Sequence, residues 1–371
     1  MSEWKEYKLG ELTIDGKGSY GIAAPAVDFN SDKYTYLRIT DINDDGTLNK
    51  NGLKSVDDKN SHKYLLRQND IVFARTGASV GRSYFYDERD GELVYAGFLI
   101  KYSIDPTKVN PKILKFYTHS QAYYDWIQTV DNGATRGNIN AQTYASMPII
   151  LPERQEQDRI ASILSSLDDK IDLLHRENAT LEQMAETLFR QWFVVEAKEE
   201  WEDVLLGNLI DIGSGKGLQR FDFVENGLYS VLGANGDIGK TNKYLVDESN
   251  RVIYTGRVGT LGNVFRLENK KAWLSDNTLV IKPKEYYNFV YFVLKLSRLQ
   301  DYNVGSTQPL IRQSDIKEIE LVLPDRGILN AFEKDCDLIY EKVENNNKQI
   351  QTLIQMRDGL LPRLMGGEVK I

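Results

Sequence analysis

The chain has 371 residues, which is too long for one ordinary domain and suggests two or three. Apolar residues make up 41% and charged residues 27% of the sequence, so sizeable cores can form and global disorder is excluded. The formal net charge of −8 would argue against a nucleic-acid partner if it were spread evenly, but the acidic excess is concentrated in one helical segment.

Cysteine and histidine usage limits the compartment and the metal chemistry. The single cysteine, Cys336, excludes an internal disulfide and is typical of a protein in a reducing cytoplasm. The N-terminal segment lacks the apolar core of a secretory signal, and no apolar run is long enough to span a membrane. The three histidines lie far apart, so we expect no metal site.

Residues 1–152 are predicted to form a globular module of mixed strands and helices. Alternating apolar residues in 70–75 predict a strand, and turn-forming residues flank it. A helical stretch is expected over 111–130, and a final strand over 147–152 closes the module.

Residues 153–196 are predicted to form a long helix. Apolar residues recur in alternating steps of four and three between Ile160 and Trp192, and the seam they form has one polar member, Asn178. This spacing is typical of a coiled coil, although an amphipathic helix packed on a globular core stays open as the simpler interpretation. The segment has ten acidic and five basic residues, a net charge of −5, and both globular parts are nearly neutral.

Residues 197–324 repeat the first module. The segment from Trp4 to Leu12 returns at 201–209, and the last strand returns at 319–324. We align Thr76-Gly77 of the first module with Thr255-Gly256 of the second, and the glycine that follows each pair, Gly81 or Gly262, aligns only if the second loop is longer. A spacing of almost 200 residues is too long for a solenoid and indicates a duplicated module.

Residues 325–366 repeat the long helix, with a seam that runs from Phe332 to Leu364 and contains Asn346. We expect the two helices to pack as an antiparallel coiled coil in which Asn178 faces Asn346 and fixes the register. In that register Arg357 faces the other seam and has to extend its guanidinium into solvent.

Catalytic motifs are weak throughout the sequence. The string from Ala234 to Thr241 matches a relaxed phosphate-loop pattern, but a strand-like run follows it where a helix would be needed. No methyltransferase motif and no histidine-centred nucleophile stands out. We therefore expect no catalytic residue in this chain.

Basic and amide side chains recur in the turn-rich parts of both modules. Arginine can bridge guanine, asparagine and glutamine can bridge adenine, and lysine can hold phosphates, although each residue taken singly is as well explained as an ordinary solvated loop residue. The predicted DNA-binding set is Lys17, Arg38, Arg75, Arg82, Arg136, Asn138, Lys216, Arg220, Asn235, Lys240, Arg257, Gln308 and Arg312.

The whole pattern resembles the DNA-specificity subunit of type I restriction–modification systems. The strings at 151–160, 188–193 and 360–368 are similar to the helix boundaries of that family. The resemblance implies an α+β fold with two similar target-recognition domains, at 1–152 and 197–324. Two long helices, at 153–196 and 325–366, would separate them and form an antiparallel coiled coil.

The resemblance also implies a function and a set of partners. Each domain would recognise one part of a split, asymmetric DNA site. Two adenine methyltransferase subunits would bring S-adenosylmethionine, and translocase–nuclease subunits would bring ATP and Mg²⁺. The chain itself would bind no cofactor and would act in DNA methylation and host defence.

Apolar residues beside the helix seams predict further protein partners, because a two-stranded coil in water would carry charges there. Contact with the chain's own modules is the alternative explanation for them. Two other functions stay open: a stand-alone DNA-binding regulator with a coiled-coil spacer, and a protein scaffold. The predicted partner-binding residues are Met184, Phe189, Tyr340, Ile354 and Leu361.

Overall fold

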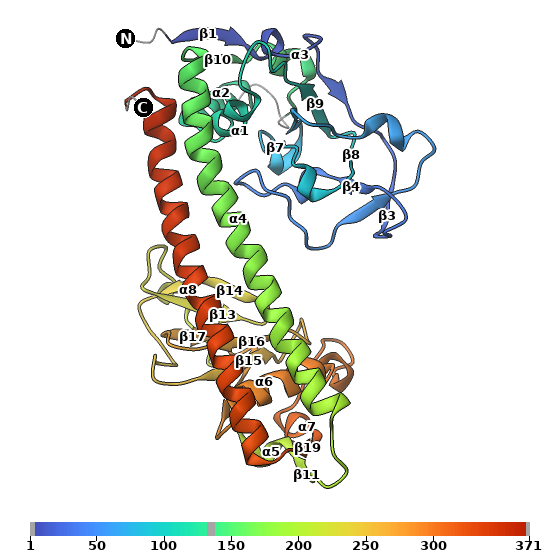
Figure 1. Cartoon of the computed structure of the whole chain (residues 1–371), viewed down its shortest axis with the longest axis vertical. Coiled ribbons are helices and arrows are strands. Elements are labelled where there is room, and N and C mark those ends of the chain that lie inside the picture. The colour runs from blue at the N-terminus through green and yellow to red at the C-terminus, as the bar shows by residue number, and fades with distance from the viewer. Residues whose placement is uncertain (1–3, 132–137, 369–371) are drawn as a thin grey trace. The chain divides into compact units, whose positions relative to one another are not determined.

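The computed structural model describes residues 4–131 and 138–368 (Figure 1). The chain divides into two compact units. Unit 1 contains the described residues up to Leu173 and those from Gln349 onward, and unit 2 runs from Leu174 to Lys348. Each unit therefore combines one globular module with a segment of each long helix.

Module 1, the globular part of unit 1, is built on two four-stranded sheets and a two-stranded ribbon. The sheets have the strand orders β2-β9-β6-β7 and β3-β5-β4-β8, and β1 pairs with β10 in the ribbon. The strands are β1 (Lys5–Lys8), β2 (Ser19–Tyr20), β3 (Ala26–Asp28), β4 (Thr35–Leu37), β5 (Lys54–Val56), β6 (Asp70–Ala74), β7 (Ser83–Phe85), β8 (Leu93–Tyr95), β9 (Leu99–Ser103) and β10 (Pro148–Leu151). The helices are α1 (Pro111–Tyr117), α2 (Gln121–Asp131) and α3 (Ala141–Ala145), with short 3-10 turns η1 (Leu9–Leu12), η2 (Ile39–Asp41), η3 (Ser61–Tyr64), η4 (Gly77–Ser79) and η5 (Glu88–Asp90).

Module 2, the globular part of unit 2, has the same plan. Its sheets have the strand orders β12-β18-β15-β16 and β14-β13-β17, and β11 pairs with β19. The strands are β11 (Glu202–Leu205), β12 (Ile210–Ser214), β13 (Tyr229–Gly233), β14 (Gly236–Thr241), β15 (Val252–Gly256), β16 (Val264–Leu267), β17 (Ala272–Leu274), β18 (Thr278–Pro283) and β19 (Glu320–Leu323). The helices are α5 (Leu206–Leu209), α6 (Tyr287–Leu296) and α7 (Gln313–Lys317), with turns η7 (Arg220–Asp222) and η8 (Leu299–Tyr302).

The shared plan confirms that the two modules are similar. β6 of module 1 lies between β9 and β7, β15 of module 2 lies between β18 and β16, and all four of these pairings are antiparallel. In both modules one strand pair of the second sheet is parallel, β4 with β8 and β13 with β17. Parallel pairs need a long connection, so their presence at the same place in both modules is a specific likeness.

The predicted alignment of the repeats is wrong at one loop. Thr76 forms an isolated bridge with Asn138, and Val258 forms the matching bridge with Leu310. Thr76-Gly77 therefore corresponds to Val258-Gly259, three residues later than Thr255-Gly256. Gly77 and Gly259 have φ values of 75° and 86°, which only glycine adopts without strain, so both loops turn at the same step.

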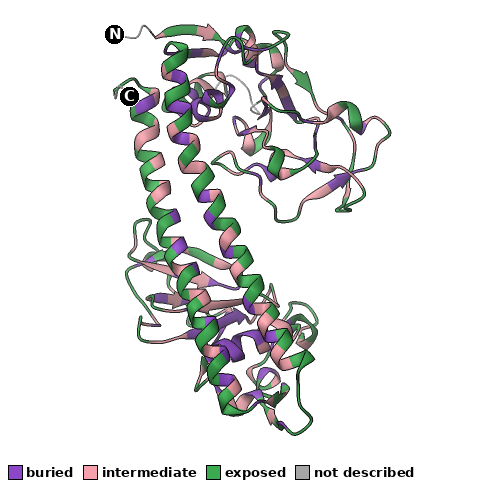
Figure 2. Cartoon of the chain, viewed as in Figure 1, coloured by how far each residue is buried: buried purple, intermediate pink, exposed green. Residues whose placement is uncertain are grey.

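Aromatic residues fill the core of module 1. Phe73 from β6 stacks on Tyr144 from α3 with ring centroids 4.7 Å apart, and it contacts the ring of Tyr102 edge-on. These side chains are fully buried, and they join the four-stranded sheet to the short helices. Figure 2 shows the buried positions in purple, concentrated in the strands and recurring at intervals along the long helices.

The two long helices are α4 (Arg154–Arg190), extended by a π-helical turn η6 (Gln191–Val195), and α8 (Arg326–Met365). In unit 2 the Asn346 side-chain amide donates to Asn178 Oδ1 at 2.9 Å, and the rings of Trp192 and Phe332 lie 6.0 Å apart. Later residues of α4 thus meet earlier residues of α8. The helix segments are antiparallel within this unit, with the two seam asparagines in one layer.

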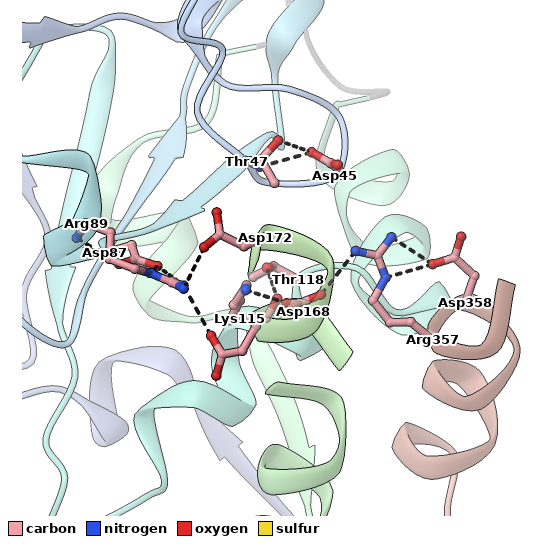
Figure 3. A network of polar contacts seen from close by, with 11 residues as sticks. Asp45, Thr47, Asp87, Arg89, Lys115, Thr118, Asp168, Asp172, Arg357 and Asp358 are labelled. Carbon is pink, nitrogen blue, oxygen red and sulfur yellow. Dashed lines mark hydrogen bonds and ion pairs between the residues drawn. The ribbon is translucent and has the colours of Figure 1, made fainter. Parts of the chain in front are cut away.

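The prediction that Arg357 extends into solvent is wrong. Its guanidinium Nη1 lies 3.2 Å from Asp168 Oδ1 within unit 1, and its side chain is 20% exposed. Asp168 also accepts from Lys115 Nζ of α1, so one carboxylate neutralises two cations (Figure 3). Asp168 lies in α4 directly after the seam residue Leu167, and its carboxylate provides the anionic partner that the apolar seam lacks.

None of the helices in the described ranges is long and apolar enough to cross a membrane.

Candidate nucleic-acid interface

Three loops of module 1 meet where Arg75 leaves strand β6. The Arg75 N–H donates to Phe98 O at 3.0 Å, and the Arg75 carbonyl accepts from the Ile139 N–H at 2.9 Å. The loops that follow β6, precede β9 and precede α3 are thus tied to one residue. Both backbone groups of Arg75 are satisfied, so its Cα is held firmly while its side chain stays half-exposed.

The Arg75 guanidinium is positioned by two neighbours. It lies over the Tyr20 ring, 4.9 Å from the centroid, and its Nε donates to Asn138 Oδ1 at 3.3 Å. The Tyr20 hydroxyl accepts from the Ala141 N–H at 3.1 Å, which holds the ring in place. Tyr20 is absent from the residues predicted from sequence. The only signal for it was its place in a Gly-rich turn, which does not specify a stacking partner 55 residues away.

Two other predicted arginines of module 1 are held by acidic residues. Arg38 is bonded through Nε and Nη2 to both oxygens of Asp41, at 2.8 and 2.6 Å. Arg82 pairs with Asp44 at 2.7 Å and donates to a backbone carbonyl of the same loop. Their guanidinium groups therefore stabilise turns through these acidic partners.

Two of the remaining predicted residues of module 1 have exposed side chains. Lys17 is exposed in the turn after η1, and Asn138 is exposed beside Arg75. Arg136 lies outside the described residues.

Module 2 repeats the loop arrangement around Arg257. The Arg257 N–H donates to Asn277 O at 2.7 Å, and its carbonyl accepts from the Ile311 N–H at 3.0 Å. The next loop is held by Gly259 N–H, which donates to Pro309 O at 3.0 Å beside the exposed Gln308. Arg257 and Gln308 therefore lie on adjoining loops at one end of the sheet.

Asn235 belongs to the same group of loops. Its Nδ2 donates to Thr260 Oγ1 at 3.0 Å, and its Oδ1 accepts from Asn263 Nδ2 at 3.2 Å. Asn263 lies one turn beyond Arg257 and was not predicted from sequence.

Lys216 and Arg312 border the same end of the sheet. The Lys216 carbonyl accepts from Trp273 Nε1 at 2.7 Å, and its N–H donates to Leu274 O. Arg312 precedes α7, whose Gln313 Nε2 bonds Ser214 Oγ at the end of β12. Both side chains are exposed.

Lys240 and Arg220 lie elsewhere in module 2. Lys240 is in β14, where its Nζ bonds Ser230 Oγ at 2.7 Å and Asp237 Oδ2 at 3.2 Å. Arg220 is exposed in η7. Lys240 lies in the three-stranded sheet, and Arg220 lies in the segment that leads into it. No contact among the described residues joins either of them to Arg257.

The described residues do not form a phosphate loop or a metal site. The predicted string begins at Ala234, and its residues Gly236–Thr241 form strand β14, whereas a phosphate loop needs a turn into a helix. Within the described ranges no group of three or more His, Cys, Asp or Glu side chains could hold a metal.

Comparison with known proteins identifies the family. A model described as the type I restriction modification DNA specificity domain matches residues 1–183 and 198–350. The two matches cover both modules and most of both helices. The chain belongs to the type I restriction–modification DNA specificity family.

Curated relatives and a solved structure agree with this assignment. The MjaIX specificity subunit of Methanocaldococcus jannaschii is 26% identical over 290 residues, which is 67% of this chain and 66% of that protein. The HindI specificity subunit of Haemophilus influenzae is 24% identical over the full length of both chains. The crystal structure of a type I S subunit from M. genitalium has a TM-score of 0.58 at 16% identity, covering 98% of this chain and 96% of that one, and shows a shared fold.

Two of the predicted partner-binding residues of this specificity-family chain are used internally. Phe189 is 5% exposed and packs against the rings of Phe289 and Phe332. The ring of Tyr340 covers the Arg266 guanidinium, whose central carbon is 3.4 Å from the ring centroid. Packing on module 2 accounts for the apolar character of both residues, which is the alternative explanation offered by the sequence.

The other three predicted partner-binding residues differ in exposure. Leu361 is half-buried against the core of unit 1, and Ile354 is partly exposed. Met184 is 51% exposed and is available to a partner.

Proposed function

We propose that this chain is the DNA-specificity subunit of a type I restriction–modification complex that recognises a bipartite, asymmetric DNA site. One observation carries the proposal: the same module occurs twice, with the same loop framework and different side chains on it. Each module would contact one half-site, and unequal loop residues would make the two half-site sequences unequal.

The proposed DNA-contacting surfaces are the loop groups around Arg75 and Arg257. They present arginine and amide side chains, which can form paired hydrogen bonds with base edges. We assign residues 1–152 and 197–324 to two target-recognition domains, and 153–196 and 325–366 to the spacer helices. The exposed lysines, Lys17, Lys216 and Lys240, would contact phosphates.

The proposed partners are two adenine methyltransferase subunits and translocase–nuclease subunits, in the cytoplasm. S-adenosylmethionine, ATP and Mg²⁺ would bind to those subunits, and this chain would contribute no catalytic group. The names of the curated relatives, specificity subunits of type I restriction enzymes, support this assignment.

The direct test is selection from duplex DNA that has two randomised blocks separated by spacers of several lengths. The full-length chain would be used with and without methyltransferase subunits. We expect enrichment of two short motifs at a fixed separation. Enrichment of one continuous motif would favour a stand-alone regulator, and no enrichment with any subunit would refute the proposal.

The absence of catalysis is tested separately. Purified chain should transfer no methyl group from S-adenosylmethionine to the selected DNA, and it should neither hydrolyse ATP nor cut DNA. Addition of methyltransferase subunits should produce methylation that depends on both motifs. Methyl transfer by the purified chain alone would contradict the proposal.

A further inference from the structure

Arg75 and Arg257 occupy equivalent positions in the two modules. Each follows the central strand of its four-stranded sheet, and each has its N–H and its carbonyl bonded to the corresponding two loops. A loop with a positive-φ glycine begins two residues after each arginine, at Gly77 and Gly259. The sequence repeat alone aligns Gly77 with Gly256 in place of Gly259.

Among the residues that the structure describes, none bonds the ends of the two guanidinium groups. Arg75 uses Nε for Asn138, and no described residue bonds its two terminal nitrogens. In the described part of the chain, no residue forms a hydrogen bond or an ion pair with the Arg257 side chain. Arg38 and Arg82, by contrast, are occupied by Asp41 and Asp44. A free, end-on pair of N–H donors matches the O6 and N7 acceptors of guanine in the major groove.

We propose that Arg75 and Arg257 are the equivalent base-contacting residues of the two modules, and that each binds a guanine in its own half-site. The inference rests on the proposed function and selects two residues from the predicted set of thirteen. Each half-site then contains a G·C pair at the equivalent position.

The residues beside each arginine distinguish the two modules. The bridge partner of the following residue is Asn138 in module 1 and Leu310 in module 2. The carbonyl that anchors the arginine belongs to Phe98 in module 1 and to Asn277 in module 2. The guanine position is thus shared, and the base pairs on either side of it are recognised differently.

Tyr20 is a positioning residue for Arg75. Its ring lies under the guanidinium, and its hydroxyl is fixed by the Ala141 N–H. Stacking limits the rotamers of Arg75 before DNA arrives, so less conformational entropy is lost on binding. Arg257 lacks a stacked aromatic ring among the described residues.

The wild-type selection described above is the first part of the test. We expect one G·C pair in each half-site whose replacement lowers binding by about 5- to 150-fold, the discrimination of one paired arginine contact. A bipartite motif without G·C in one half-site would overturn the inference and leave the proposed function standing. Failure to select any motif would remove both.

Variants of the full-length chain then assign the contact. Arg75→Ala should abolish the G·C preference in one half-site and leave the other unchanged, and Arg257→Ala should do the converse. Arg75→Lys keeps the charge and should not restore the preference. Uniformly weaker binding that lysine rescues would make Arg75 a phosphate contact and overturn the inference.

Matched control arginines exist in both units. Arg67 is exposed in the turn before β6, at the opposite end of the strand from Arg75, and Arg326 is exposed at the start of α8. Alanine at either position removes the same charge and should leave both half-site preferences intact. Loss of preference in these controls would show that net charge, and not the position, determines recognition.

The role of Tyr20 has its own readout. Tyr20→Leu should lower affinity for the G·C-containing half-site several-fold without changing which base is preferred, and Tyr20→Phe should restore most of the affinity because the ring is kept. Equal loss in both variants, with an unchanged melting temperature, would assign Tyr20 to hydrogen bonding and overturn its stacking role.

Discussion

At the scale of single residues, the local partners of a charged side chain determine what it can do. Arg38, Arg75 and Arg82 lie in similar turn-rich sequence, yet two are held by aspartates and one is stacked, with its terminal nitrogens unbonded by any described residue. The same rule applies to cations near α8. Arg357 occupies a coiled-coil seam and is stable there because Asp168 lies beside it.

We expect His119 to make the protein sensitive to acid. Burial, together with the nearby Lys115, lowers the pKa of His119 from 6.5 to about 4, and its ring lies against the turn at Gly46. Because the pKa of His119 is lower in the folded protein, the unfolded chain binds a proton at a higher pH than the folded protein does. Stability contributed by neutral His119 is therefore present above pH 6.5 and is lost as the pH falls toward 4, by about 2–3 kcal/mol.

Urea unfolding at pH 7.5 and at pH 4.5 checks this expectation. His119→Gln should reduce the loss of stability between the two pH values. His175 is exposed on α4, so His175→Gln should leave that loss unchanged. Identical pH dependence in the wild type and the His119→Gln variant would contradict the assignment.

Asp168 should matter more for stability than either of its cations (Figure 3). Asp168→Asn leaves Lys115 and Arg357 close together without their shared carboxylate, and should cost about 2 kcal/mol of unfolding free energy. Arg357→Leu leaves Asp168 paired with Lys115 and adds an apolar seam residue, so it should cost less than about 1 kcal/mol. Chemical denaturation measures both, and a larger cost for Arg357→Leu would show that Asp168 is not the centre of the network.

At the scale of elements, the seam of the long helices contains one buried polar layer. Asn346 is fully buried and Asn178 is 7% exposed, and the Asn178 side chain also donates to Asn347 Oδ1 at 2.9 Å. Buried asparagines in coiled coils commonly lower stability and specify register, because a shifted register leaves their amides unpaired.

Replacing Asn178 and Asn346 together with leucine should raise stability by about 1–2 kcal/mol and weaken the register. Spin labels at the exposed Gln183 and Glu341 would report the register as an inter-label distance within unit 2. We expect one narrow distance distribution in the parent chain and a broader or split distribution in the variant. Asn345→Leu, at an exposed position of the same helix, is the control, and an unchanged narrow distribution in the double variant would refute a register role.

At the scale of the whole molecule, unit 1 is assembled from two distant parts of the chain, whereas unit 2 is one continuous stretch. Residues from Gln349 onward belong to unit 1, although module 2 separates them from the rest of it in sequence. Leu364 is 2% exposed in the core that also contains Ile160 and Leu164. Unit 1 thus needs the C-terminal part of α8 to complete its core.

A fragment of residues 1–173 should therefore bind a synthetic peptide of residues 349–371. At saturating peptide we expect a rise in melting temperature of roughly 5–10 °C, since about 3 kcal/mol of binding energy is linked to folding. A peptide with Leu364→Glu should bind much more weakly. No shift with the parent peptide, measured by calorimetry, would show that unit 1 folds without this segment.

The duplicated modules, the two long helices and the pairing of Asn178 with Asn346 were all predictable from sequence. These features depend on local periodicity and on repeated strings, which the residues specify without knowledge of distant contacts. The four-three spacing defined the seam, and its one asparagine per helix made a single register self-consistent.

The tertiary structure alone decided which polar residues are free to bind. Tyr20 stacks under Arg75, Asp168 meets Arg357 and Asp44 occupies Arg82, and each pair joins segments that are distant in sequence. Such pairs depend on how irregular loops close, and no periodic pattern encodes loop closure. The equivalence of Arg75 and Arg257 emerged for the same reason, because hydrogen bonds between loops define it, while the intervening residues differ in number and type.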